Sequence, residues 1–167
     1  FNDAKSLAPV AHSVEIYNHG CAVDCDRPDG THMLDLLLSD GFKINGIATD
    51  DAHFKTKDYF GGWVNVKSQS NRPESLLTAL KHGHYYSSCG PEIYNIELNK
   101  KSIKVTCSKV CSAIVLGNGS ASNVCHGDEM TSVEMSLEPF FNSRWIRLVI
   151  IDGNNKRAWS NPIWLNS

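Results

Sequence analysis

Short apolar segments and amphipathic helical patterns alternate in the first half of the sequence. Runs of β-branched and aromatic residues are typical of strands, and they predict strands at residues 14–17, 43–48 and 63–67. A loop is expected at residues 18–30, because this stretch is rich in Gly, Asp and Pro. The strands are short enough to be buried in the core of a single domain.

Two helices are predicted between and after these strands. The first begins at Thr31, whose hydroxyl group can cap it, and ends near Gly41. The second begins at Pro73, which suits a first helical turn, and ends near Gly83. Each helix places three leucines on one face: Leu34, Leu37 and Leu38 in the first, and Leu76, Leu77 and Leu80 in the second. Strands alternating with helices indicate βα units and a mostly parallel sheet.

From about residue 92 the pattern changes to short strands separated by turns. The expected strands are residues 93–98, 102–107, 113–116, 130–137, 145–151 and 157–159. The polar stretch Asn99-Lys100-Lys101 predicts a hairpin turn between the first two of them. No long helical pattern interrupts this region, so we expect a small antiparallel sheet or sandwich.

Composition and charge exclude several classes of protein. Of the 167 residues, 41% are hydrophobic and the formal net charge is −2, which is typical of a globular protein rather than a disordered one. This balance provides no electrostatic reason to bind nucleic acid or an anionic membrane. No apolar run is long enough to span a bilayer, and the first residues do not resemble a signal peptide. We therefore expect a cytoplasmic location.

Six cysteines include two pairs with three intervening residues, Cys21 with Cys25 and Cys107 with Cys111. Such pairs suggest zinc, but zinc knuckles more often have two intervening residues and need a matching second half. We expect reduced, partly buried thiols instead.

The segment 44–53 carries the clearest candidate chemistry. A predicted buried strand ends there in Thr49-Asp50-Asp51-Ala52-His53. Ligands of α/β sheets gather at the carboxyl ends of strands, and residues two apart in extended backbone face the same side. Asp51 and His53 can therefore bind one Zn, Mn or Fe ion together. The alternative is that Asp50 and Asp51 cap a turn and His53 is an ordinary surface residue.

Residues 46–53 and the following Gly61-Gly62-Trp63-Val64 resemble the last metal-binding motif of the PHP family, named for polymerase and histidinol phosphatase. Further segments fit the same family in the same order along the chain. They are residues 14–18, 34–41, 76–91 and 158–164. The resemblance therefore covers most of the sequence.

The resemblance implies a metal-dependent hydrolase, typically a phosphoesterase, on a distorted seven-stranded β/α barrel. The expected fold class is α/β, with residues 1–91 forming the C-terminal part of a PHP-type barrel and residues 92–167 a small antiparallel β lobe. Asp51 and His53 match the final Asp-x-His pair of metal ligands, and Asp51 would also accept a proton from metal-bound water. Glu15, Asn18 and Asp50 would line the pocket.

One departure from the family pattern concerns the start of the barrel. PHP enzymes begin with a His-x-His pair on the first strand, whereas His82-Gly83-His84 here follows the second predicted helix. About four barrel strands are also missing, so we expect the C-terminal portion of such a protein, with an incomplete metal site and little activity by itself. The parent protein would act on a small phosphorylated or ester-type substrate, and the exposed barrel edge would favour self-association. The alternative is a non-catalytic binding or scaffold module.

Overall fold

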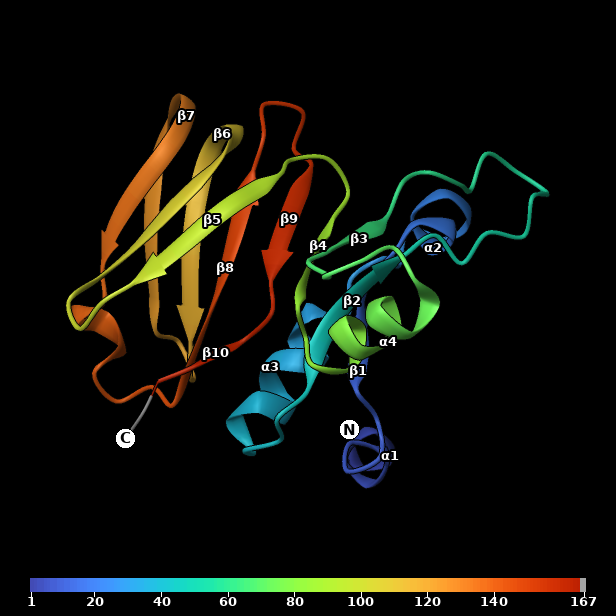
Figure 1. Cartoon of the computed structure of the whole chain (residues 1–167), viewed down its shortest axis with the longest axis horizontal. Helices are drawn as coiled ribbons and strands as arrows, with labels where there is room; N and C mark the ends of the chain where they lie inside the picture. Colours follow the sequence, from blue (N-terminus) through green and yellow to red (C-terminus); the bar gives the residue numbers. More distant parts are fainter. Residues whose placement is uncertain (166–167) are drawn as a thin grey trace. The chain divides into compact units, whose positions relative to one another are not determined.

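The computed structural model describes residues 1–165, which form two compact units (Figure 1). The N-terminal unit comprises Phe1–Ser87 and the C-terminal unit begins at Ser88. The described part of the chain contains four α-helices, ten strands and one short 3-10 helix. None of its helices has both the length and the apolar character needed to cross a bilayer.

The N-terminal unit contains all four α-helices and a parallel strand pair. Its elements are α1 (Asn2–Leu7), β1 (Ser13–Asn18), α2 (His19–Asp24), α3 (Thr31–Ser39), β2 (Asn45–Thr49), β3 (Trp63–Val66), α4 (Pro73–Lys81) and β4 (Tyr85–Ser88). Strands β1 and β2 run parallel, from Ser13 opposite Asn45 to Asn18 opposite Thr49, with an irregularity after Glu15. The parallel arrangement places the carboxyl ends of both strands at the same edge.

Helix α3 packs against this strand pair and forms the core of the unit. Leu34, Leu37 and Leu38 are buried on one face of α3, and Ile16 of β1 is buried with them. Gly46 of β2 allows the close approach, because a Cβ atom there would lie 2.9 Å from Ile16 and 3.1 Å from Leu34. Burial of these aliphatic side chains is the main force that holds the helix on the strands.

The C-terminal unit is antiparallel throughout its described strand pairs. Its elements are β5 (Ile93–Leu98), β6 (Ser102–Gly117), β7 (Ser122–Ser136), the 3-10 helix η1 (Glu138–Phe140), β8 (Trp145–Ile151), β9 (Arg157–Ser160) and β10 (Ile163–Trp164). Strand β6 is central: it pairs with β5, β7 and β8, while β8 also pairs with β9 and β10. The register of β6 against β7 shifts twice between Thr106 and Ser112, and this irregularity lets the long strand bend.

Alternation along much of β6 buries one face of the sheet. Ile103, Val105, Ala113 and Val115 are buried, whereas neighbours such as Lys104 are more exposed. Strand β8 is buried along nearly its whole length, with Trp145 completely enclosed. Apolar side chains of β6 and β8 therefore form a core within this unit.

The expected α/β barrel class is wrong. About 42% of the chain is strand and only 20% is helix, and the main sheet is a curled antiparallel half-barrel. Two long strands, β6 with 16 residues and β7 with 15, account for much of the difference. Turn-like residues within β6 and β7 predict several shorter strands from the sequence. A β-bulge, however, lets a strand continue through such a stretch. Of the two expectations for the C-terminal region, a small antiparallel sheet or a sandwich, the structure has a curled antiparallel sheet.

Local elements agree more closely with expectation, although helix α1 and strand β4 were not expected and two further features differ. Helix α2 lies inside the expected loop at residues 18–30, because the Asn18 side chain caps it by accepting the Cys21 N–H at 2.7 Å. On α4, Leu77 is exposed although it was expected to share a buried face, and Ala79 is the buried residue.

Candidate functional site

Polar side chains gather where the parallel strands β1 and β2 end. Asn18 is the last residue of β1 and Thr49 the last of β2, and the two lie opposite each other. Asp50, Asp51 and His53 follow β2 directly along the chain. Parallel pairing therefore brings the expected site residues of both strands to one edge.

Asn18 links the two carboxylates of this cluster. Its Nδ2 group donates to Glu15 Oε2 and to Asp51 Oδ2, both at 3.1 Å. Its Oδ1 atom accepts the Cys21 N–H that caps α2. Both polar atoms of the amide group are thus engaged in three hydrogen bonds, and Asn18 itself is buried. This arrangement orients the Asp51 carboxylate and leaves its Oδ1 atom clear of Asn18.

Glu15 supports the cluster from within β1. The Thr49 hydroxyl donates a short hydrogen bond to Glu15 Oε1, while Asn18 occupies Oε2. Both carboxylate oxygens of Glu15 therefore have donors from neighbouring residues. Glu15 and Thr49 hold the ends of the two strands together, and Thr49 is a member of the site that sequence reasoning missed.

Asp51 and His53 form the exposed part of the cluster. His53 Nε2 lies 3.7 Å from Asp51 Oδ1, and their side chains are 66% and 57% exposed, respectively. Asp51 has a positive φ of 49°, a conformation that aspartate and asparagine adopt more readily than most residues. This turn of the backbone brings Asp51 and His53 to the same side.

Asp50 has a different environment from its neighbour Asp51. Its carboxylate accepts the backbone N–H groups of Phe60, Gly61 and Gly62 at 2.7–2.8 Å. Burial opposes its ionisation, but the N–H groups of Gly61, Gly62 and Phe60 outweigh this effect and lower the pKa of Asp50. Asp50 therefore anchors the loop that returns from His53 to β3.

Asp58 is a second anchor of the same loop, and sequence reasoning did not identify it. It is only 1% exposed and accepts the N–H groups of His53 at 2.7 Å and Phe54 at 3.2 Å. The His53 N–H is the largest influence that lowers the pKa of Asp58. Asp58 thus fixes the backbone of the candidate ligand His53.

Glycines allow the loop to close over this edge. A Cβ atom at Gly61 would lie 2.2 Å from the His19 ring, and one at Gly62 would lie 2.6 Å from the Thr49 carbonyl oxygen. At Gly62 the neighbour is backbone, so only glycine fits, whereas a side chain at position 61 would require the His19 ring to move. The adjacent glycines were a sequence signal for this close approach.

No protein-family model, no curated protein and no solved structure matches this chain. The likeness to the PHP family therefore remains a hypothesis that rests on sequence motifs. What can be inferred about function comes from the contacts among Glu15, Asn18, Asp51 and His53.

The expectation of a metal-binding group needs a correction. Among residues 1–165, no three or more His, Cys, Asp or Glu side chains are placed to hold one metal ion. Asp51 and His53 can contribute two ligands. Glu15 does not add a third, because its oxygens are engaged by Asn18 and Thr49.

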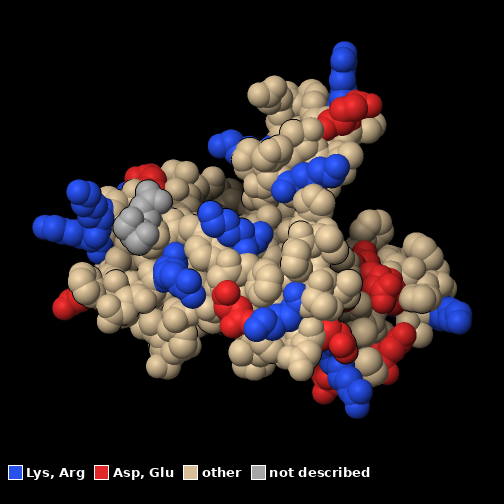
Figure 2. Space-filling model, turned by 90° about the horizontal axis from the view of Figure 1, so that it is seen from below, with Lys and Arg blue, Asp and Glu red and all other residues tan. Residues whose placement is uncertain are grey.

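Charged side chains of both signs, separated by uncharged surface, occupy the face of the molecule in Figure 2.

Proposed function

We propose that Asp51 and His53 form half of a divalent-metal site that serves the hydrolysis of phosphate esters. The observation that supports this proposal most directly is the 3.7 Å separation of Asp51 Oδ1 and His53 Nε2. Two ligand atoms on a tetrahedral zinc ion, each about 2.0–2.1 Å from the metal, lie about 3.3 Å apart. A small rotation of either exposed side chain accounts for the difference.

The chemistry of the donors also fits a divalent ion. A carboxylate oxygen and an imidazole nitrogen suit Zn, Mn and Fe. Asn18 holds Asp51 Oδ2, so Oδ1 is the carboxylate oxygen directed to His53. Support of a ligand by a neighbouring hydrogen-bond donor is usual in metal sites.

The residues of this chain would bind and orient the metal ion, and one of them would accept a proton. Asp51 is the group that can accept a proton from a water molecule at the site. The bound ion would lower the pKa of that water and polarise the phosphoryl group. Further ligands would have to come from water or from a polypeptide other than residues 1–165. The proposed substrate is a small phosphorylated compound.

Metal titration of purified chain tests the proposal. Zn²⁺ and Mn²⁺ binding would be measured by calorimetry for the wild type, Asp51→Asn and His53→Ala. Both variants should bind the metal at least about 10-fold more weakly than the wild type, because even loss of an outer-shell partner of a metal ligand lowers metal affinity by about 10- to 100-fold. Asn keeps nearly the shape of Asp and tolerates the positive φ at position 51.

Two matched controls come from the same unit. Asp26 is also exposed and also has a positive φ, of 56°, so Asp26→Asn repeats the chemical change away from the pair. His32 is an exposed histidine at the start of α3, so His32→Ala is the control for His53→Ala. Equal affinities in the wild type and in all four variants would overturn the proposal.

A second candidate is a non-catalytic binding or scaffold module. It is favoured by the lack of a third ligand among the residues that the structure describes. Metal titrations that do not distinguish Asp51→Asn from Asp26→Asn would support this second function.

All six cysteines are described and are free thiols, which supports the further proposal of a reducing, cytoplasmic location.

A further inference from the structure

Two cysteine pairs of equal spacing have different surroundings in this protein. Cys21 and Cys25 lie on α2 and at its C-terminal cap, whereas Cys107 and Cys111 lie on strand β6. Positions four apart on an α-helix are neighbours, with Cα atoms about 6.2 Å apart. Four residues of extended strand span about 13 Å.

This difference decides which pair can form a bond. Disulfides require Cα atoms about 4.4–6.8 Å apart, a condition that the helical pair meets and the strand pair does not. They also require Cβ atoms about 3.5–4.5 Å apart, so the Cβ atoms of the helical pair, about 5–6 Å apart in a regular helix, must move closer. Cys107 is also buried, and the Cys111 thiol lies 3.2–3.3 Å from the carbonyl oxygens of Ile151 and Asp152. The same sequence spacing therefore has opposite consequences in the two units.

The Cys25 side chain at the end of α2 turns back toward Cys21. The Cys25 Sγ atom lies 3.5 Å from the Cys21 carbonyl oxygen, which also accepts the Cys25 N–H at 3.1 Å. Burial raises the pKa of the Cys21 thiol, and the charge and the side-chain hydrogen bond of Cys25 raise it further. The Cys25 thiol therefore lies against the backbone of Cys21.

The local backbone permits the bridge. Helix α2 ends at Asp24, and Cys25 has φ −144° and ψ 5°, outside the helical region. A regular helix would resist the adjustment that a bond between positions four apart requires, but a cap residue can rotate. Cys25 can move without breaking the Cys21 N–H bond to Asn18.

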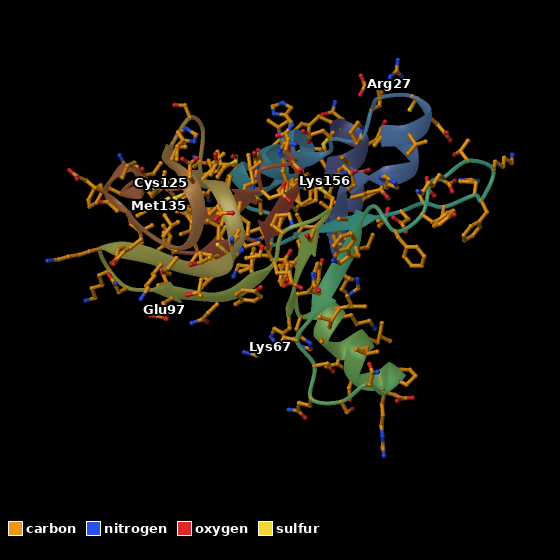
Figure 3. The ribbon with its side chains drawn as sticks, turned by 90° about the horizontal axis from the view of Figure 1, so that it is seen from above. Arg27, Lys67, Glu97, Cys125, Met135 and Lys156 are labelled. Carbon is orange, nitrogen blue, oxygen red and sulfur yellow. The ribbon has the colours of Figure 1, made fainter. Side chains whose placement is uncertain are left out.

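The site is open to small molecules. Cys25 and its neighbours Val23, Asp24, Asp26 and Arg27 are exposed. Arg27 extends outward from the loop that follows α2 (Figure 3). A disulfide reagent can therefore reach Cys25 without any opening of the core.

We propose that Cys21 and Cys25 form a dithiol modification site that a small-molecule disulfide oxidises to an intramolecular disulfide. The Cys25 thiolate attacks one sulfur of the reagent, which forms a mixed disulfide and releases one thiolate. The Cys21 thiolate then attacks the Cys25 sulfur, forms the protein disulfide and releases the second thiolate. The protein loses two hydrogen atoms, and one reagent disulfide is reduced to two thiols.

Exchange with glutathione disulfide tests the proposal on the full chain. After incubation and acid quenching, remaining thiols are alkylated, and the protein is cleaved after Lys and Arg, except before Pro. Peptide 6–43 then contains Cys21 and Cys25 and no other cysteine, whereas cleavage at Lys109 separates Cys107 from Cys111. Peptide 6–43 should lose two hydrogen atoms and resist alkylation at both cysteines, while Cys107 and Cys111 are not bridged.

Serine variants and unfolding provide the controls. In Cys21→Ser, a glutathione adduct should persist on Cys25, because no second thiol displaces it. Cys107→Ser should behave as the wild type, as should Cys125→Ser on β7 (Figure 3). In denaturant both pairs should bridge, because equal spacing leaves them equally close in an unfolded chain. Alkylation of both Cys21 and Cys25 in the folded wild type, a lasting adduct on Cys25 there, or equal bridging of both pairs in the folded protein would overturn the proposal.

Discussion

At the scale of single residues, three aspartates of one short segment have distinct roles. Asp50 and Asp58 each accept backbone N–H groups of the same loop, whereas Asp51 is exposed beside His53. A carboxylate that accepts several backbone N–H groups is stabilised in its charged form. The backbone around each aspartate, rather than its residue type, therefore decides whether it anchors a loop or is available to a ligand.

Asp50 should make the N-terminal unit sensitive to acid. Its pKa in the folded protein is lowered, so its contribution to stability is complete above the unfolded value of about 3.9 and is lost as pH falls through the folded value. Asp50→Asn keeps an acceptor for Gly61 and Gly62 but presents an amide to the Phe60 N–H. We expect a loss of about 1–3 kcal/mol at neutral pH and a smaller loss at pH 3. Urea unfolding at both pH values measures this.

Asp26→Asn is the control for this experiment, because Asp26 is exposed and has a similarly positive φ. Its free energy of unfolding should follow the wild-type pH dependence. A loss in Asp50→Asn that is the same at neutral pH and at pH 3 would show that the charge of Asp50 does not stabilise the loop.

At the scale of elements, α3 and α4 show that two helices of equal length can bury different numbers of side chains. Both have nine residues and both have leucines at helical spacing. Three leucines of α3 are buried, whereas on α4 only Ala79 is buried. A helix contributes to stability mainly through the apolar face that it buries, so α3 is the principal helix of its unit.

Matched leucine substitutions should distinguish the two helices. Leu37 of α3 is 1% exposed and Leu77 of α4 is 53% exposed. Leu37→Ala should lower the free energy of unfolding by about 2–5 kcal/mol, because it leaves a cavity in the core. Leu77→Ala should change it by less than about 1 kcal/mol, as is usual for surface positions. Chemical denaturation of the two variants provides the comparison, and equal losses would contradict the assignment of the core to α3.

At the scale of the whole molecule, each of the two units has its own apolar core. Leucines of α3 and Ile16 form the first, and residues of β6 and β8 form the second. The two halves of the chain also differ in charge: residues 1–92 have eight basic and twelve acidic residues, and residues 93–167 have eight and six. The candidate metal ligands and the dithiol both belong to the N-terminal unit.

The C-terminal unit should fold by itself. A protein of residues 88–167 keeps β5 to β10, including Trp145 of β8, which is completely buried in the folded chain. We expect cooperative unfolding in urea and blue-shifted tryptophan emission, because the indole of Trp145 is removed from water. Fluorescence and amide hydrogen exchange measure both properties. A disordered fragment with emission typical of exposed tryptophan would show that its core depends on the first 87 residues.

Much of the local structure follows from the sequence alone. The leucine spacing and the residues around Thr31 and Gly41 predicted α3, and β-branched runs predicted β1, β2 and β8. These features depend on interactions between residues close along the chain, which a sequence displays directly. The segment after β2 also made Asp51 and His53 a candidate pair from the sequence. Asp51 has a positive φ of 49°, however, so the 3.7 Å between the two side chains does not result from the extended backbone that was expected.

Only the tertiary structure decided the sheet architecture and the roles of the polar residues. A curled antiparallel sheet replaced the expected barrel, because strand pairing depends on partners distant in sequence. Asp50 acquired its role from N–H groups ten to twelve residues later. Equal spacing in Cys21–Cys25 and Cys107–Cys111 could not show which pair is close, because that distance depends on whether the backbone between the cysteines is helical or extended.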